Sequence, residues 1–222
     1  MIDTHIEESS HADARVTPEL LDKIGDILHK HGFRGMRMDN VAKALSISKR
    51  TLYEIFGSKE EMVICVMDYF HRKMHERDLE SFQKAANVME ALLLIFSYHR
   101  DMIREVNVNF FNDMEECYPQ IHARYHVDEE MVNEWMANLY KIGVKEGMFR
   151  PDIDFLLSCR LFKVQMESLK RMEDNFPPGL TIVQAFDAIT IGFLRTIASP
   201  QGMEILDALT PGNTLTGMDN MK

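Results

Sequence analysis

The sequence predicts an all-α protein with a small N-terminal helix-turn-helix domain and a larger C-terminal helical bundle. Gly and Pro number only 11 and 7 among 222 residues, which leaves few turns and favours long helices. Apolar residues recur at spacings of three and four along most of the chain, which is the period of a buried helix face. No segment alternates apolar and polar residues in the way that a half-buried strand does.

Composition indicates an ordinary globular protein, with 45% hydrophobic and 27% charged residues. The longest apolar run, Ala91–Phe96, is far too short to span a bilayer. Residues 1–15 lack the apolar core of a signal peptide. The cysteines Cys65, Cys117 and Cys159 are odd in number and widely spaced, so we expect reduced thiols in a cytoplasmic protein.

The charge is unevenly distributed along the chain. The net charge is −10, yet Thr17–Lys73 carries ten basic residues and eight acidic ones. Because salt screens charges beyond about 10 Å, local charge decides the affinity for phosphates. The chain is therefore expected to have a mildly basic N-terminal domain and an acidic body.

The N-terminal elements are marked by capping residues. Residues 1–16 are expected to form a disordered arm, and residues 17–58 the helix-turn-helix domain. Thr17 and Pro18 suit the first positions of a helix that Gly32 ends. A second helix presents Met38, Val41, Ala42 and Leu45 on its buried face, and a turn at 45–48 follows.

The third helix, Lys49–Phe56, is capped by Ser48, which can accept from the Thr51 N–H. At 100° per residue, Leu52, Ile55 and Phe56 share the inward side. Arg50 and Glu54 point outward, flanked by Thr51 and Tyr53, and Lys49 stands at the helix entrance. The major groove of DNA admits such a helix, N-terminal end first.

The second region, residues 59–222, is predicted to be a helical bundle. Ser58 and Glu61 form a capping box, which opens a helix that should extend to about Ala86. The further helices are expected at Val88–Phe111, Glu129–Glu146, Asp152–Asn175, Leu180–Ser199 and Gly202–Leu209.

The residues of the N-terminal domain resemble the signature of TetR-type transcriptional regulators. The most specific part joins the turn Ala42-Lys43-Ala44-Leu45-Ser46-Ile47-Ser48 to Thr51-Leu52-Tyr53 and to Phe56-Gly57-Ser58-Lys59-Glu60-Glu61. The resemblance covers about Leu20–Met62. It implies a dimer that binds a palindromic operator in double-stranded DNA, usually as a repressor, and a body that binds a small-molecule effector. Carried over by position, the implied DNA-binding residues are Arg37, Ser48, Lys49, Arg50, Thr51, Tyr53 and Lys59.

Three departures from the family pattern concern the operator. Ser46 stands where Gly is usual in the turn, and a left-handed Ser there is expected to cost about 1 kcal/mol. Arg50 stands where Gly is common and adds a hydrogen-bond donor. At the start of the second helix, Arg37 stands where the family frequently has Thr, and Asp39 stands where it frequently has Arg or a small polar residue. The operator sequence therefore cannot be borrowed from relatives.

The last two long helices are expected to form the dimer interface, because both look apolar on two sides. In the first of them, one stripe holds Phe155, Cys159, Phe162, Met166 and Leu169, and another holds Leu157, Leu161 and Val164. In the second, one side holds Ile182, Phe186, Ile189 and Phe193, and Ala188, Ile191, Leu194 and Ala198 extend the other. Burial inside a single-chain bundle is the alternative.

The body is expected to enclose an apolar cavity for the effector. The candidate lining residues lie on the inward stripes of their helices: Phe96, His99, Ile103, Phe110, Trp135 and Met166. They include one titratable group and no fixed charge, which predicts an apolar or amphipathic ligand.

Two other classes of function stay open at this point. The body could bind a protein partner instead of a small molecule. An all-helical enzyme is disfavoured, because no nucleophile–base pair and no phosphate loop is evident. His71/His75 and His122/His126 have a spacing that permits shared metal ligation, but neither pair belongs to an HExxH motif or has an obvious third ligand. We therefore expect no metal site and no other cofactor.

Overall fold

The computed structural model describes residues 14–105, 110–124, 129–169 and 179–215. These residues confirm the all-α fold class, since their only β interaction is an isolated bridge between Phe149 and Ala198. The chain forms two compact units, Met1–Glu76 with Glu105–His126, and Arg77–Arg104 with Val127–Lys222. Most of the expected N-terminal arm, residues 1–13, lies outside the described residues.

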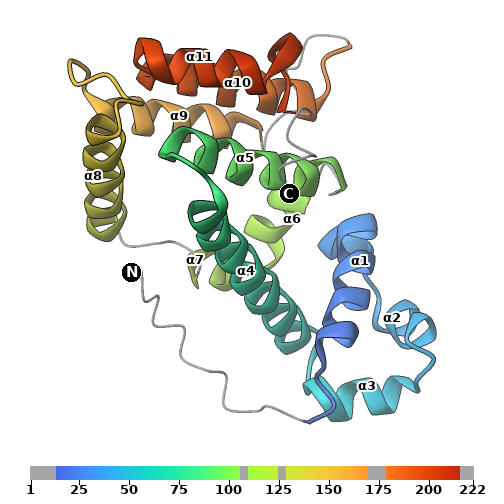
Figure 1. Ribbon diagram of the computed structural model, residues 1–222. Coiled ribbons are helices and arrows are strands. Elements are labelled where there is room, and N and C mark those ends of the chain that lie inside the picture. The colour runs from blue at the N-terminus through green and yellow to red at the C-terminus, as the bar shows by residue number, and fades with distance from the viewer. Residues whose placement is uncertain (1–13, 106–109, 125–128, 170–178, 216–222) are drawn as a thin grey trace. The chain divides into compact units, whose positions relative to one another are not determined.

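The first unit contains the helix-turn-helix (Figure 1). Its helices are α1 (Pro18–Gly35), α2 (Met38–Ala44), α3 (Lys49–Phe56), the first part of α4 (Lys59–Lys84), α6 (Phe110–Cys117) and α7 (Pro119–Arg124). The Thr17 hydroxyl accepts from Leu20 N at 3.3 Å, as the capping pattern predicts. Gly32 has a φ of 65° and breaks the helical geometry, although helical residues continue to Gly35.

Helices α6 and α7 belong to the core of the first unit, which the sequence did not predict. The Phe110 ring lies 4.8 Å from the Phe33 ring, measured between centroids. Arg34 forms an ion pair with Asp113 at 3.2 Å, and Ile121 is fully buried in the same core. The first unit is thus larger than the expected domain at 17–58, because a distant segment completes its apolar core.

The second unit is built from α5 (Val88–Glu105), α8 (Glu129–Lys145), α9 (Phe155–Leu169), α10 (Ile182–Ile197), α11 (Pro200–Leu209) and the last part of α4. A short 3₁₀-helix, Pro211–Asn213, follows. Helices α9 and α10 pack side by side (Figure 1). The core of this unit includes Met89 and Leu93 of α5 and Leu194 of α10, none of them measurably exposed.

The structure corrects the expectation that Ile191, Leu194 and Ala198 of α10 form an outer apolar side for a dimer interface. Ile191, Leu194 and Ala198 are buried within the chain, because they face the core of the second unit and not solvent. The second stripe of α9 differs, since Leu157, Leu161 and Val164 are exposed by 51%, 57% and 66%. Only α9 therefore shows the apolar outer side that was expected of both helices.

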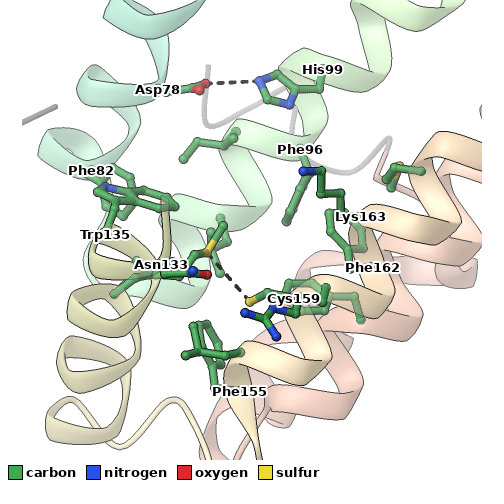
Figure 2. Close-up of a pocket in the computed structure, with 18 residues that line it drawn as sticks. Asp78, Phe82, Phe96, His99, Asn133, Trp135, Phe155, Cys159, Phe162 and Lys163 are labelled. Carbon is green, nitrogen blue, oxygen red and sulfur yellow. Dashed lines mark hydrogen bonds and ion pairs between the residues drawn. The ribbon is translucent and has the colours of Figure 1, made fainter. Parts of the chain in front are cut away.

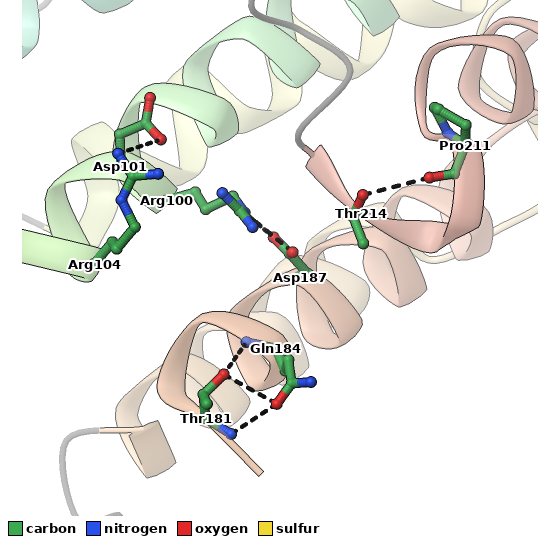
Figure 3. A network of polar contacts seen from close by, with 8 residues as sticks. All are labelled: Arg100, Asp101, Arg104, Thr181, Gln184, Asp187, Pro211 and Thr214. Atoms are coloured by element: carbon green, nitrogen blue, oxygen red, sulfur yellow. Dashed lines mark hydrogen bonds and ion pairs between the residues drawn. The ribbon is translucent and has the colours of Figure 1, made fainter.

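A buried ion pair joins α5 to α10 (Figure 3). Arg100 Nε lies 2.9 and 3.0 Å from the two carboxylate oxygens of Asp187, whose side chain is 5% exposed. Burial raises the pKa of Asp187, while Arg100 and the backbone N–H of Leu215 act against that rise. Asp187 therefore depends on its partners for the charged state.

Arg100→Met should lower the free energy of unfolding by about 3 kcal/mol, because it leaves a buried carboxylate without its partner. Arg100→Met combined with Asp187→Leu should cost less than the single substitution, since no charge remains buried. The measurement is urea denaturation at one fixed protein concentration.

Arg104→Met is the matched control, since the Arg104 side chain is 58% exposed and pairs with Asp101 at 3.7 Å on the same helix. It should cost less than about 1 kcal/mol. Equal losses for Arg100→Met and Arg104→Met would contradict the importance of the buried pair.

Candidate nucleic-acid interface and ligand cavity

The turn between α2 and α3 is closed by backbone hydrogen bonds. Ser46 has a φ of 57°, as the sequence predicts for the position where the resembled family usually has Gly. Ile47 N donates to Ala42 O at 3.0 Å, and the Ile47 side chain packs against the first core. The left-handed Ser46 costs about 1 kcal/mol, and the contacts of Ile47 hold the turn in spite of that cost.

Helix α3 is oriented by its inner side. Leu52 and Phe56 are buried in the first core, and the Ser48 hydroxyl accepts from Thr51 N at 3.0 Å. Gly57 ends the helix with a φ of 71°, and its N–H donates to Tyr53 O. These contacts leave the opposite side of the helix in solvent.

That solvent side is here called the recognition surface, and it consists of Lys49, Arg50, Thr51 and Tyr53. The side chain of Arg50 is 89% exposed and its Nε lies 2.9 Å from Glu54 Oε1. Lys49 Nζ lies 3.0 Å from Asp39 Oδ2, and this contact raises the pKa of Lys49. Exposed pairs of this kind contribute about 0–1 kcal/mol, so both cations can exchange their carboxylates for phosphates or bases at small cost.

Two other predicted contact residues lie beside this surface. Arg37 is exposed at the N-cap position of α2, with no side-chain capping bond. Lys59, the first residue of α4, donates from Nζ to Phe33 O at 2.9 Å. Partial burial lowers the pKa of Lys59. In this structure Lys59 therefore stabilises the end of α1, a role that the sequence did not indicate.

The second unit encloses a cavity of about 450 Å³ (Figure 2). Four of the six expected lining residues are present in its wall: Phe96, His99, Trp135 and Met166. Ile103 packs against the core of the second unit instead. Phe110 was predicted wrongly, because it begins α6 and lies in the core of the first unit.

Aromatic rings form much of the cavity wall. The centroid of the Phe162 ring lies 5.5 Å from the centroid of the Phe96 ring and 4.5 Å from that of the Phe193 ring. Trp135 meets Phe82 edge to face at 6.4 Å. Burial raises the pKa of the Cys159 thiol to about 12. The cavity thus suits a ligand with a substantial apolar part.

Charged side chains also line the cavity, and sequence reasoning missed them. His99 Nε2 lies 3.4 Å from Asp78 Oδ1 of α4, and neither buried atom has a hydrogen-bond partner among the described residues. Arg160 and Lys163 of α9 belong to the lining as well. The sequence could have indicated that Arg160 and Lys163 lie near the cavity, because each directly follows a residue of the inward stripe, Cys159 or Phe162.

The geometry of the first unit defines a helix-turn-helix protein with a cationic recognition helix. Residues 20–66 match the family model described as "Bacterial regulatory proteins, tetR family". The repressor KstR2 of Mycobacterium tuberculosis (strain ATCC 25618 / H37Rv) is 26% identical over 149 residues, which cover 65% of this chain and 74% of that protein.

Two solved structures share the fold. A TetR-family regulator from Agrobacterium tumefaciens has a TM-score of 0.61 at 12% identity, covering 82% of this chain and 96% of that one. SCO4454, a TetR-family regulator from Streptomyces coelicolor, has a TM-score of 0.60 at 16% identity, covering 81% and 94%. The match to the tetR family model thus covers α1 to the first part of α4, and the chain shares its fold with solved TetR-family regulators.

The described residues include neither a candidate metal cluster nor a candidate membrane span. They contain no group of three or more His, Cys, Asp or Glu side chains that could hold a metal ion. Of the two histidine pairs, His126 lies outside the described residues. None of the described helices is both long and apolar enough to cross a membrane.

Proposed function

We propose that the protein is a dimeric repressor whose operator binding is relieved by a small effector held in the cavity of the second unit. The observation that carries the proposal is the recognition surface of α3, where Lys49 and Arg50 are exposed and only weakly paired. A protein of this kind meets its operator in the cytoplasm. We infer repression, and not activation, from the relatives, which are named as transcriptional repressors.

On DNA, α3 enters the major groove, where Arg50 donates to a guanine and Lys49, Thr51 and Tyr53 bind phosphates or bases. Ser48 caps the N-terminus of α3 and keeps it ordered beside the sugar-phosphate backbone of the DNA. Arg37 and Lys59 extend the contact to phosphates on either side. Lys59 must exchange the Phe33 carbonyl for a phosphate, or share its three hydrogens between them.

The cavity supports control by a small molecule over control by a protein partner. Its wall takes Asp78 and Phe82 from α4, and the same helix begins at Lys59, three residues after α3 ends. A ligand that favours another position of α4 changes the separation of the two recognition helices in a dimer. It lowers operator affinity only by its differential affinity for the two arrangements.

The outer side of α9 and α10 supports the dimer. Leu157, Leu161 and Val164 form an exposed apolar stripe on α9. On α10, Ala188 and Gly192 are exposed small residues one helical turn apart, and a Cβ placed on Gly192 would meet no atom of the described chain within 4 Å. Small residues beside an apolar stripe permit close packing of two such helix pairs.

Arg50→Ala should relax base preference at one position in each half-site, at a cost of about 1–3 kcal/mol if the contact with guanine is bidentate. Glu54→Gln should tighten binding to all sequences, because it removes a negative charge and the competing partner of Arg50. The measurement is selection of bound DNA from a random pool, followed by affinity titrations at several salt concentrations.

Lys30→Ala is the control, since it removes one exposed positive charge from α1, away from the recognition surface. It should leave base preference unchanged. If Arg50→Ala behaves in the same way as Lys30→Ala, Arg50 does not contact a base.

Leu161→Glu should shift the protein toward a monomer in sedimentation experiments at micromolar concentration, because it places a charge within the proposed interface on each subunit. Ile142→Glu is the matched control, since Ile142 is 48% exposed on α8. Dimers of equal affinity for both variants would place the interface elsewhere, and a monomeric parent protein would contradict the dimer altogether.

Effector binding and operator binding should weaken each other by the same factor, as linkage requires. Trp135 is the single tryptophan of the chain and lines the cavity, so its fluorescence reports binding there. Candidate ligands are titrated with and without operator DNA. A ligand that changes Trp135 fluorescence and leaves operator affinity unchanged would show that the cavity is not the switch.

A further inference from the structure

We propose that the ligand of the cavity is an apolar molecule with one negatively charged group, and that Arg160 and Lys163 bind this group. The inference rests on the proposed function only in taking the cavity as the effector site. It revises the sequence prediction, in which the lining had no fixed charge.

The two cations have no partner inside the described chain. Arg160 and Lys163 lie on α9, three residues apart and therefore on the same side of the helix. Both are among the residues that line the cavity, and neither makes an ion pair or hydrogen bond with any described residue. In Figure 2 the Lys163 side chain extends from its helix toward the Phe96 ring.

Three other cations of the second unit do have carboxylate partners. Arg100, Arg150 and Arg195 each contact a carboxylate within 3 Å. The protein as a whole has 35 acidic and 25 basic residues, so acidic partners are in excess. Two neighbouring cations beside an apolar cavity therefore form a local site for an anion in an acidic protein. The distant acidic residues do not cancel this attraction, because salt screens charges beyond about 10 Å.

The remaining lining defines which anion fits. The aromatic wall described above excludes a ligand that is polar throughout, because its groups would lose hydration without replacement. Asn133 of α8 lines the same cavity and supplies an amide that can donate a further hydrogen bond. Asp78 places a negative charge beside His99, so the anionic group of the ligand is expected at the α9 side and its apolar part against Phe82 and Trp135.

The test uses alkyl chains that differ only in the end group. Dodecanoate, dodecanol and dodecyltrimethylammonium are titrated below their aggregation concentrations, with Trp135 fluorescence as the readout. Shorter and longer pairs of acid and alcohol, from eight to sixteen carbons, cover the unknown length. The acid should bind about ten- to hundredfold more tightly than the alcohol of equal length, which is the value of one charge-assisted hydrogen bond, and the cation should bind most weakly.

Arg160→Gln combined with Lys163→Gln should abolish the preference for the acid and leave the affinity for the alcohol within about threefold. The matched control is Lys141→Gln combined with Lys145→Gln, which removes the same charge from exposed positions on α8 that do not line the cavity. The control should keep the preference. Circular dichroism and sedimentation verify that both variants remain folded and equally assembled.

The proposal is overturned if no acid in the series binds in preference to its alcohol, or if the α9 double variant keeps the preference. It is also overturned if the α8 control loses the preference equally, because general charge would then be the cause. Measuring release of operator DNA by each ligand distinguishes failure of the anion site from failure of the proposed function. Release by an alcohol alone would retain the switch and refute the anion site. Selective binding of the acid without release would retain the anion site and refute the switch.

Discussion

The burial of Leu52 and Phe56 beneath α3 is the constraint on which the helix-turn-helix of the first unit depends. Leu52 is fully buried, so rotating the helix would expose an apolar side chain at a cost of about 1.5–3 kcal/mol. The same rotation would bury Arg50, which is far more costly without a partner. Orientation of the recognition surface is therefore fixed by the core, and the exposed ion pairs contribute little to it.

Helix α9 shows how a single element serves two surfaces. Its inner side supplies Cys159, Phe162 and Met166 to the cavity, while Leu157, Leu161 and Val164 remain exposed. Arg160 and Lys163 stand between these sides. If the proposed dimer packs against α9, a change in that packing would also move the cations at the cavity, and assembly and ligand affinity would then be coupled through one helix.

The sequence predicted the helix-turn-helix well, because capping residues and side-chain periodicity act locally. The cap at Ser48, the stop at Gly57 and the left-handed Ser46 are all found. The cavity was predicted less completely, because its wall depends on contacts between distant segments. Phe110 continues the apolar stripe of Phe96 and Ile103 in the sequence, yet α5 ends at Glu105 and Phe110 begins another helix. Asp78 was missed because nothing local marks a carboxylate on α4 as facing His99.

The state of Cys159 has a consequence for oxidative chemistry. Only the thiolate is nucleophilic and readily oxidised, and a thiol with a pKa of about 12 remains protonated throughout the physiological range. The cavity therefore contains a sulfur atom that peroxides and electrophiles scarcely attack, while the thiol of Cys117 lies exposed on the first unit. Sulfur oxidation in the cavity wall is consequently expected at the thioethers of Met136 and Met166, which need no deprotonation, and not at Cys159.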